Sequence, residues 1–156
     1  MGVWRPKYKQ GVTLWKQQNT SVSVTGTTDE TTLFTATLPG GLLGPNGVLC
    51  VDQLHSWTSN ANNKNFRLYL GSTVFAWIVR TTGAVSGWQR FIFNRNNQAS
   101  QVTTALAASG WEVPGGVVIT GTEDTSADLT FKLTGQLANA ADTLVLEAFY
   151  SYLVRP

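Results

Sequence analysis

The sequence predicts an all-β protein: a two-sheet antiparallel sandwich of the jelly-roll type with an extended N-terminal arm. Two observations favour this fold class. From residue 21 onward, short runs of β-branched and aromatic residues alternate with turn residues. No apolar pattern of helical period extends beyond about two turns. The 156 residues suit a sandwich domain over residues 21–156, preceded by an arm over residues 1–20.

The N-terminal arm interleaves aromatic and basic side chains without a regular period. Its distinctive residues are Trp4, Arg5, Tyr8 and Trp15. Such a segment can bind nucleic acid, because cations contact phosphate while aromatic rings stack on bases. It can equally lie along a partner protein as an anchor. The second interpretation is favoured, because the arm is short and the rest of the chain carries no matching basic patch.

The first half of the domain shows strands separated by clear turn signals. Pro45-Asn46-Gly47 predicts a tight turn, because proline fixes φ while asparagine and glycine tolerate positive φ. In one long strand Leu54 falls on the face opposite to its apolar neighbours, which is consistent with a bulge near Asp52. The expected strands are Ser21–Gly26, Thr31–Leu38, Val48–Trp57, Lys64–Gly71 and Thr73–Arg80.

The second half continues the same pattern. A turn over 83–87 precedes the next strand, and Pro114-Gly115-Gly116 precedes another. The segment 102–107 fits either a strand or a short helical turn. The remaining expected strands are Trp88–Arg95, Val117–Gly121, Asp128–Gly135 and Thr143–Val154. Eight to ten short strands are typical of a sandwich or barrel.

The last strand is apolar on both faces. One face carries Leu144, Leu146, Ala148, Tyr150, Tyr152 and Val154, and the other carries Val145, Phe149 and Leu153. A strand with one face in water should alternate apolar and polar residues. The segment 73–80 is also apolar on both faces. We therefore expect self-association, with an interface formed by Trp77, Phe149, Tyr150, Tyr152 and Leu153.

The residues offer little for catalysis. His55 is the single histidine and lies inside an expected strand, so we expect a structural or interface role. The acidic loop with Glu123, Asp124 and Asp128 fits a solvated hairpin turn better than a calcium loop, because it lacks a fixed ligand spacing. Cys50 is the single cysteine, which excludes an internal disulfide and predicts a small buried side chain. We expect no catalytic residue, cofactor or metal.

Composition and charge limit the kinds of partner that we expect the chain to bind. The net charge is +2 and charged residues make up 13% of the chain, so nucleic-acid binding by the whole domain is not expected. No signal peptide and no apolar run of about 18 residues is found, so we expect synthesis in a cytoplasm and no membrane segment.

Some residues are candidates for contact with a glycan. Trp88 and Trp111 each follow a glycine turn, and Asn60 and Asn62 lie in a polar loop. Exposed tryptophan rings stack on sugars, but tryptophan also fills cores and subunit interfaces. Both interpretations of the tryptophans stay open from the sequence, and core or interface packing is favoured.

The order of several segments resembles a loose family of small virion proteins of tailed bacteriophages. The resemblance covers roughly residues 30–152 and rests on segments 32–39, 41–49, 58–64, 66–68 with Gly71, 124–131 and 144–150. The family implies a jelly-roll domain that serves as a capsid decoration protein, head fibre or fibre tip, commonly as a trimer. No catalytic motif comes with it.

The sequence and this resemblance together predict a non-enzymatic structural protein of the virion. We expect the arm to attach it to another capsid or tail protein. The alternative is a carbohydrate- or receptor-binding module at a fibre tip, which contacts a host surface glycan.

Overall fold

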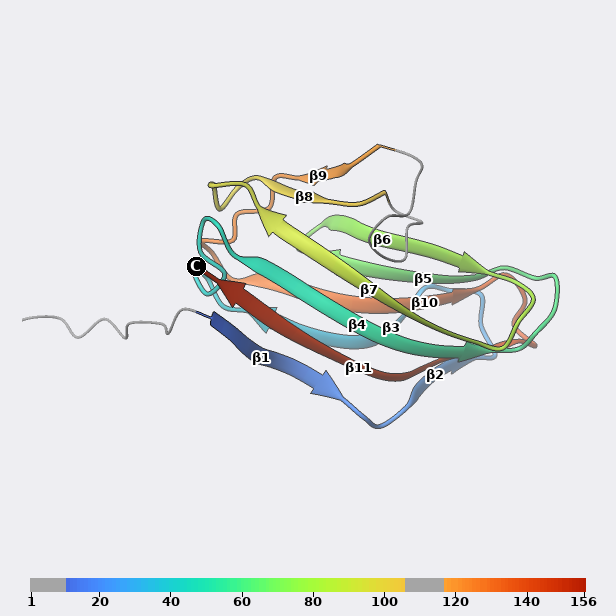
Figure 1. Ribbon diagram of the computed structural model, residues 1–156. Coiled ribbons are helices and arrows are strands. Elements are labelled where there is room, and N and C mark those ends of the chain that lie inside the picture. Colours follow the sequence, from blue (N-terminus) through green and yellow to red (C-terminus); the bar gives the residue numbers. More distant parts are fainter. Residues whose placement is uncertain (1–10, 106–116) are drawn as a thin grey trace, which may run out of the picture.

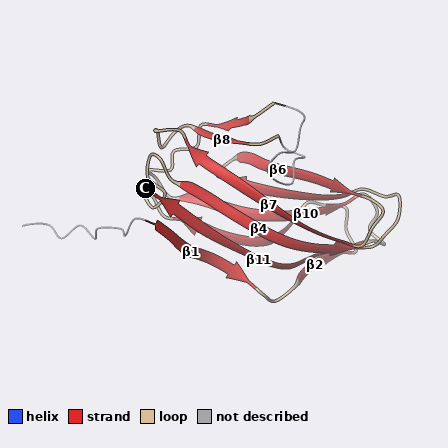
Figure 2. Cartoon of the chain, in the orientation of Figure 1, coloured by secondary structure: helices blue, strands red, loops and turns tan. Residues whose placement is uncertain are grey.

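The protein folds into two antiparallel β-sheets that pack face to face (Figure 1). The computed structural model describes residues 11–105 and 117–156. A seven-stranded sheet has the order β1-β11-β4-β7-β8-β9, with β2 also paired to β11, and a four-stranded sheet has the order β3-β10-β5-β6. The described residues form strands and loops only, so none of them forms a helix that could cross a membrane (Figure 2). The expected all-β antiparallel sandwich is confirmed.

The strands follow the alternation of the sequence. The seven-stranded sheet contains β1 (Gly11–Gln18), β2 (Val22–Thr25), β4 (Val48–Trp57), β7 (Val85–Asn94), β8 (Gln101–Thr103), β9 (Ile119–Gly121) and β11 (Thr143–Arg155). The four-stranded sheet contains β3 (Thr31–Leu38), β5 (Lys64–Leu70), β6 (Thr73–Arg80) and β10 (Leu129–Leu137). The segment 102–107, for which a strand or a helical turn was expected, begins as strand β8.

The core lies between the two sheets. Alternate residues of each strand point inward, as Phe66, Leu68 and Leu70 of β5 do. From the other sheet, Leu49 and Val51 of β4 meet them. These side chains are at most 1% exposed. Burial of apolar surface at about 25 cal/mol per Å² is the main source of stability for such a sandwich.

A β-bulge in β11 explains why this strand reads as apolar on both faces. Leu146 pairs with His55 and Ala148 pairs with Leu54, so Glu147 is an extra residue. The bulge reverses the face on which side chains point. Leu144 and Leu146 therefore face the core before it, and Phe149 and Leu153 face the core after it.

The bulge expected near Asp52 is not in β4. This strand pairs with β7 without a register shift, and its residues Leu49, Val51, Gln53, His55 and Trp57 are all buried. Leu54 is out of phase because it belongs to the outer face of a regular strand. The irregularity that the sequence suggested lies in the neighbouring strand.

The arm expected over residues 1–20 is shorter in the structure. Gly11–Gln18 forms β1, an edge strand that pairs antiparallel with β11. Trp15 lies at an irregularity in this pairing and packs edge-on against Phe131, with ring centroids 5.3 Å apart. Trp15 is therefore a partly buried residue of the sandwich rather than an anchoring residue. Trp4, Arg5 and Tyr8 lie outside the described residues.

Candidate functional site: the outer face of the seven-stranded sheet

A groove of about 470 Å³ crosses the outer face of the seven-stranded sheet. Two small residues create it, because Ala148, Leu54 and Gly87 form one row across β11, β4 and β7. A β-carbon added at Gly87 would meet only the carbonyl oxygen of Gln53, at 3.6 Å, so the space above this residue is open. The groove is lined by Asn19, Asp52, Gln53, Leu54, Gly87, Trp88, Gln89, Ala148, Phe149 and Tyr150.

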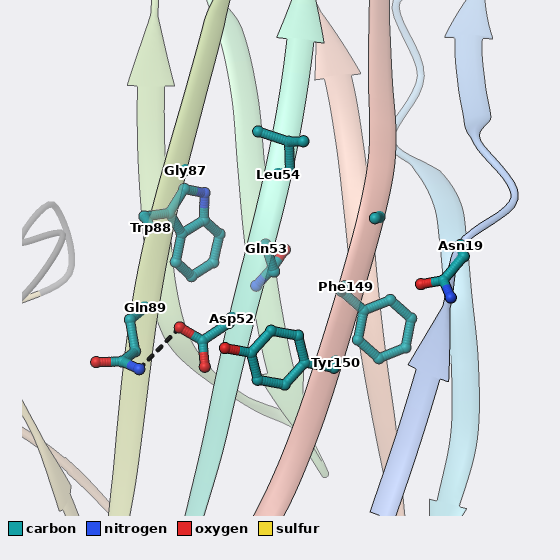
Figure 3. Close-up of a pocket in the computed structure, with 10 residues that line it drawn as sticks. Asn19, Asp52, Gln53, Leu54, Gly87, Trp88, Gln89, Phe149 and Tyr150 are labelled. Carbon is teal, nitrogen blue, oxygen red and sulfur yellow. Dashed lines mark hydrogen bonds between the residues drawn. The ribbon is translucent and has the colours of Figure 1, made fainter. Parts of the chain in front are cut away.

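The next row of the sheet makes one wall of the groove polar. It contains Tyr150, Asp52 and Gln89, which are paired across the same three strands. The Nε2 atom of Gln89 donates a hydrogen bond to Oδ1 of Asp52 at 2.7 Å, and the carboxylate lies between Gln89 and the Tyr150 hydroxyl (Figure 3). The charge of Asp52 raises the pKa of Tyr150, so this phenol stays protonated and can donate a hydrogen bond.

Several exposed apolar side chains lie on the same face of the sheet as the groove. Leu54 is 43% exposed and Tyr150 is 48% exposed. On the neighbouring edge strand β1, Leu14 pairs with Tyr152 and Val12 pairs with Val154, so these residues share the outer face. Val12 is 69% exposed and Leu14 is 57% exposed. Exposed apolar side chains therefore occur on the outer face of β1, β11 and β4, with the polar residues Gln17 and Asp52 on either side of Tyr150. We call this surface the apolar face.

The residues expected at a subunit interface do not form one surface. Phe149 and Leu153 are 2% and 1% exposed and belong to the core, which corrects their assignment. Tyr150 and Tyr152 lie on the apolar face, where their rings stack with centroids 6.2 Å apart. Trp77 lies on the four-stranded sheet, on the other side of the sandwich. Only the two tyrosines therefore remain as candidates on the apolar face.

Trp88, a predicted ligand contact, is a core residue. Its indole is 5% exposed and stacks on the imidazole of His55, with ring centroids 5.7 Å apart and an interplanar angle of 7°. Its side chain points into the sandwich, so it meets the groove from beneath. Only 5% of this residue is exposed, so Trp88 offers little surface for stacking on a glycan. The glycine before it lies inside β7, which begins at Val85, and not in a turn. Trp111 lies outside the described residues.

His55 is held as a neutral imidazole. It is 1% exposed, and its Nε2 atom donates a hydrogen bond to Oε1 of Gln53 at 2.9 Å. Burial lowers the pKa of His55 to about 3. An imidazole with this pKa is neutral at neutral pH and is too weak a base to take up a proton there, so it is unsuited to general acid–base chemistry.

Asn60 and Asn62, also predicted ligand contacts, hold a loop in place. Their amide nitrogens donate to the carboxylate of Asp142 at 2.6 and 3.0 Å. Lys64, which is fully buried, lies 3.5 Å from the same carboxylate and donates to the backbone oxygen of Asn62. Burial alone would raise the pKa of Asp142, but the hydrogen bonds from the two amides and the charge of Lys64 lower it. This cluster joins two loops, so both asparagines have a structural role in the fold.

The acidic loop also serves the fold. Glu123 accepts hydrogen bonds from the backbone and hydroxyl of Ser72, at 3.0 and 2.8 Å, and from Thr73. Asp128 accepts one from the backbone of Gly40 at 2.8 Å. In the part of the chain that the structure describes, no group of His, Cys, Asp or Glu side chains is arranged to hold a metal. The interpretation of this loop as a turn agrees with these contacts.

Sequence reasoning missed the groove, although two signals for it were present. Leu54 stood on the wrong face for a core residue, and Gly87 lies in a run that became a strand. A glycine within a strand often marks a place where another chain or ligand comes close to the backbone. Which residues of β11 join them depends on the bulge at Glu147, which the sequence does not reveal.

Comparisons with known proteins show distant structural likeness. No protein-family model and no curated protein matches the chain. A solved structure of the CBM2 module of the evolved Dit of Lactobacillus casei BL23 phage J-1 is similar at a TM-score of 0.39 and 12% identity, over 76% of this chain and 67% of that one. Structures of the infectious bursal disease virus Gx strain and of the infectious bursal disease virus VP2 subviral particle are similar at TM-scores of 0.30 and 0.37, both at 11% identity. The chain spans 45% and 46% of the length of those two chains.

Proposed function

We propose that this protein is a non-enzymatic structural component of a tailed-phage particle. It assembles as a homotrimer through the apolar face, and its N-terminal residues attach it to another protein of the capsid or tail. The observation that carries the proposal is the apolar face itself. Val12, Leu14, Leu54 and Tyr150 each expose 43–69% of their surface on the same outer face of the seven-stranded sheet. Soluble monomers rarely leave large apolar surfaces of this kind in water.

The groove gives the apolar face the shape of an interface. A partner copy can insert a side chain above Gly87 and Ala148, where the row of Tyr150, Asp52 and Gln89 offers hydrogen bonds beside it. Interfaces commonly combine a buried apolar centre with a polar rim, and tyrosine is enriched in them. The trimeric number and the place in a virion rest on the sequence resemblance described above.

The absence of a chemical role is supported by the state of His55. Its pKa of about 3 leaves the single histidine of the chain unable to act as a base with a pKa near neutrality. The acids at Glu123 and Asp128 accept hydrogen bonds from turns of the fold. Attachment is assigned to Trp4, Arg5 and Tyr8 on composition.

Paired surface substitutions test the assembly. Leu14→Asp and Tyr150→Asp place a charge on the apolar face, and Thr37→Asp places the same charge on an exposed residue of the opposite sheet. Light scattering should show that the first two variants dissociate, while Thr37→Asp keeps the mass of the wild type. Equal masses for all three variants would contradict the proposal.

Truncation tests the attachment. Removal of residues 1–10 leaves every described strand intact, so the melting temperature should stay within about 2 °C of the wild type. Particles assembled in the presence of this variant should lack the protein, whereas Thr37→Asp particles should contain it. Normal incorporation of the truncated protein would show that these residues are not the anchor.

A further inference from the structure

We infer that Trp77, on the outer face of the four-stranded sheet, is a stacking platform for an uncharged saccharide. The platform consists of Trp77 with Asn65, Arg67 and Val79 on β5 and β6. It lies on the opposite side of the sandwich from the apolar face, so it stays accessible when that face is covered. The inference therefore goes beyond the assembly proposed above and does not depend on it.

The indole of Trp77 is fixed in one orientation. Its Nε1 atom donates a hydrogen bond to Oδ1 of Asn65 at 3.0 Å. The guanidinium carbon of Arg67 lies 4.6 Å from the ring centroid, so one face of the indole rests on this cation. The side chain is nevertheless 43% exposed. The exposed part of the ring is the part that Arg67 does not cover.

Arg67 is in turn held by a network that crosses the sheet. Its NH1 atom donates to Oε2 of Glu30 at 2.9 Å, and its NH2 atom donates to Oε1 of Gln136 at 2.9 Å. Glu30 also accepts hydrogen bonds from Tyr69 at 2.8 Å and from Thr134 at 2.6 Å. The support beneath Trp77 is therefore rigid. An exposed ring that is already ordered loses little rotamer entropy when a ligand stacks on it.

The charges around the platform favour an uncharged ligand. The charge of Arg67 is balanced by Glu30, and burial, which would raise the pKa of this carboxyl, is outweighed by hydrogen bonds from Thr134 and Tyr69 and by the charge of Arg67. Glu30 therefore stays ionised at neutral pH and neutralises the charge of Arg67 beside the indole. Lys132, whose ammonium lies 4.4 Å from the Tyr69 ring centroid, acts on the same carboxylate.

The surroundings favour a saccharide over a protein partner. Trp77 and Val79 are the exposed apolar side chains of β6, each 43% exposed, and their neighbours Asn65 and Arg67 are polar. A protein interface usually surrounds its central aromatic residue with further apolar contacts. A sugar ring offers an apolar C–H face for the indole and hydroxyl groups for the polar neighbours, which matches this surface.

The test is a titration followed by nuclear magnetic resonance. The ¹⁵N-labelled full chain is titrated separately with chitotriose, maltotriose and cellotriose, and with trigalacturonate as an anionic counterpart. At least one neutral trisaccharide should shift the indole resonance of Trp77, which is identified by its loss in Trp77→Phe. Trigalacturonate should bind no more tightly than the neutral sugars, and added salt should leave the affinity for the neutral sugar unchanged.

Two variants separate this inference from the proposed assembly. Trp77→Ala should weaken binding at least about tenfold, while its oligomeric mass stays that of the wild type. Tyr150→Asp should change the mass and keep the affinity for the sugar. The inference fails if no neutral trisaccharide shifts the Trp77 resonance, if Trp77→Ala binds as tightly as the wild type, or if only trigalacturonate binds.

Discussion

At the scale of single residues, several polar side chains that could bind a ligand instead stabilise the fold. His55, Asn60 and Asn62 are residue types that often serve ligands, yet each is committed to a partner inside the protein. Trp88 is likewise packed on His55. Their types could be read from the sequence, whereas their partners could not, because Asp142 is about eighty residues from Asn60 and Asn62 along the chain.

The burial of His55 predicts acid sensitivity. Its pKa is about 3 in the folded protein against 6.5 for a free imidazole, so below about pH 6.5 the unfolded state binds a proton that the folded state does not. Stability is therefore lost as the pH falls from 6.5 towards 3. Between about pH 7 and about pH 4.5 the free energy of unfolding should drop by about 2–3 kcal/mol from this residue.

Urea unfolding at the two pH values measures this effect. His55→Gln retains an amide that can hydrogen-bond Gln53 but has no titrating group, so its stability should depend less on pH over this interval. An equally steep pH dependence in the variant would assign the effect to other groups.

Removal of one of the loop amides that bind Asp142 should lower the stability of the protein. Asn62→Ala removes the 3.0 Å hydrogen bond to Asp142 and should lower the melting temperature by about 2–4 °C. Asn97→Ala, at another turn with a local side-chain hydrogen bond, serves as a comparison. Calorimetry checks the shift, and sugar binding at Trp77 should be the same in both variants.

At the scale of elements, the bulge in β11 decides which residues are core and which are surface. Without it, the pattern of the last strand cannot be assigned to faces, which is why Phe149 and Leu153 were expected at an interface. The strands with clean alternation, such as β5 and β10, were predictable, since period-two patterns require no knowledge of a partner. The sequence pattern did not predict the edge strand β1, because its outer residues face solvent and its pairing depends on β11.

Deletion of Glu147 tests the role of the bulge. Removal of this residue shifts one half of β11 by one position relative to β4, so its core residues would turn outward. The deletion variant should fail to fold cooperatively. Glu147→Ala keeps the extra residue and loses only the hydrogen bond from Ser56, so it should unfold cooperatively with a loss of about 1 kcal/mol. A deletion variant with a native-like transition would show that the bulge is dispensable.

At the scale of the whole molecule, the two outer faces differ in character. The apolar face over β1, β11 and β4 suits burial against another copy, whereas the opposite sheet carries a supported tryptophan among polar residues. A module built in this way can assemble through one sheet and leave the other exposed. The sequence indicated that apolar strands needed a partner, but the division of these residues between two faces follows from the topology.

A substitution at Gly87 should weaken assembly without lowering the stability of the fold. Gly87→Val should fill the groove without strain, because its β-carbon meets only one atom at 3.6 Å. Replacement of a strand glycine should leave stability unchanged or raise it by up to about 1 kcal/mol. The same variant should associate more weakly in light scattering, while Thr37→Asp should not. Unchanged association would mean that the groove receives no partner side chain.

The central claim is that the apolar face is buried between copies of this chain. Sedimentation equilibrium of the purified wild-type chain at micromolar concentration tests this most directly. The account predicts a mass three times the 16.9 kDa of the single chain, and a return to the single-chain mass in Leu14→Asp. A wild-type chain that sediments as a monomer would contradict it.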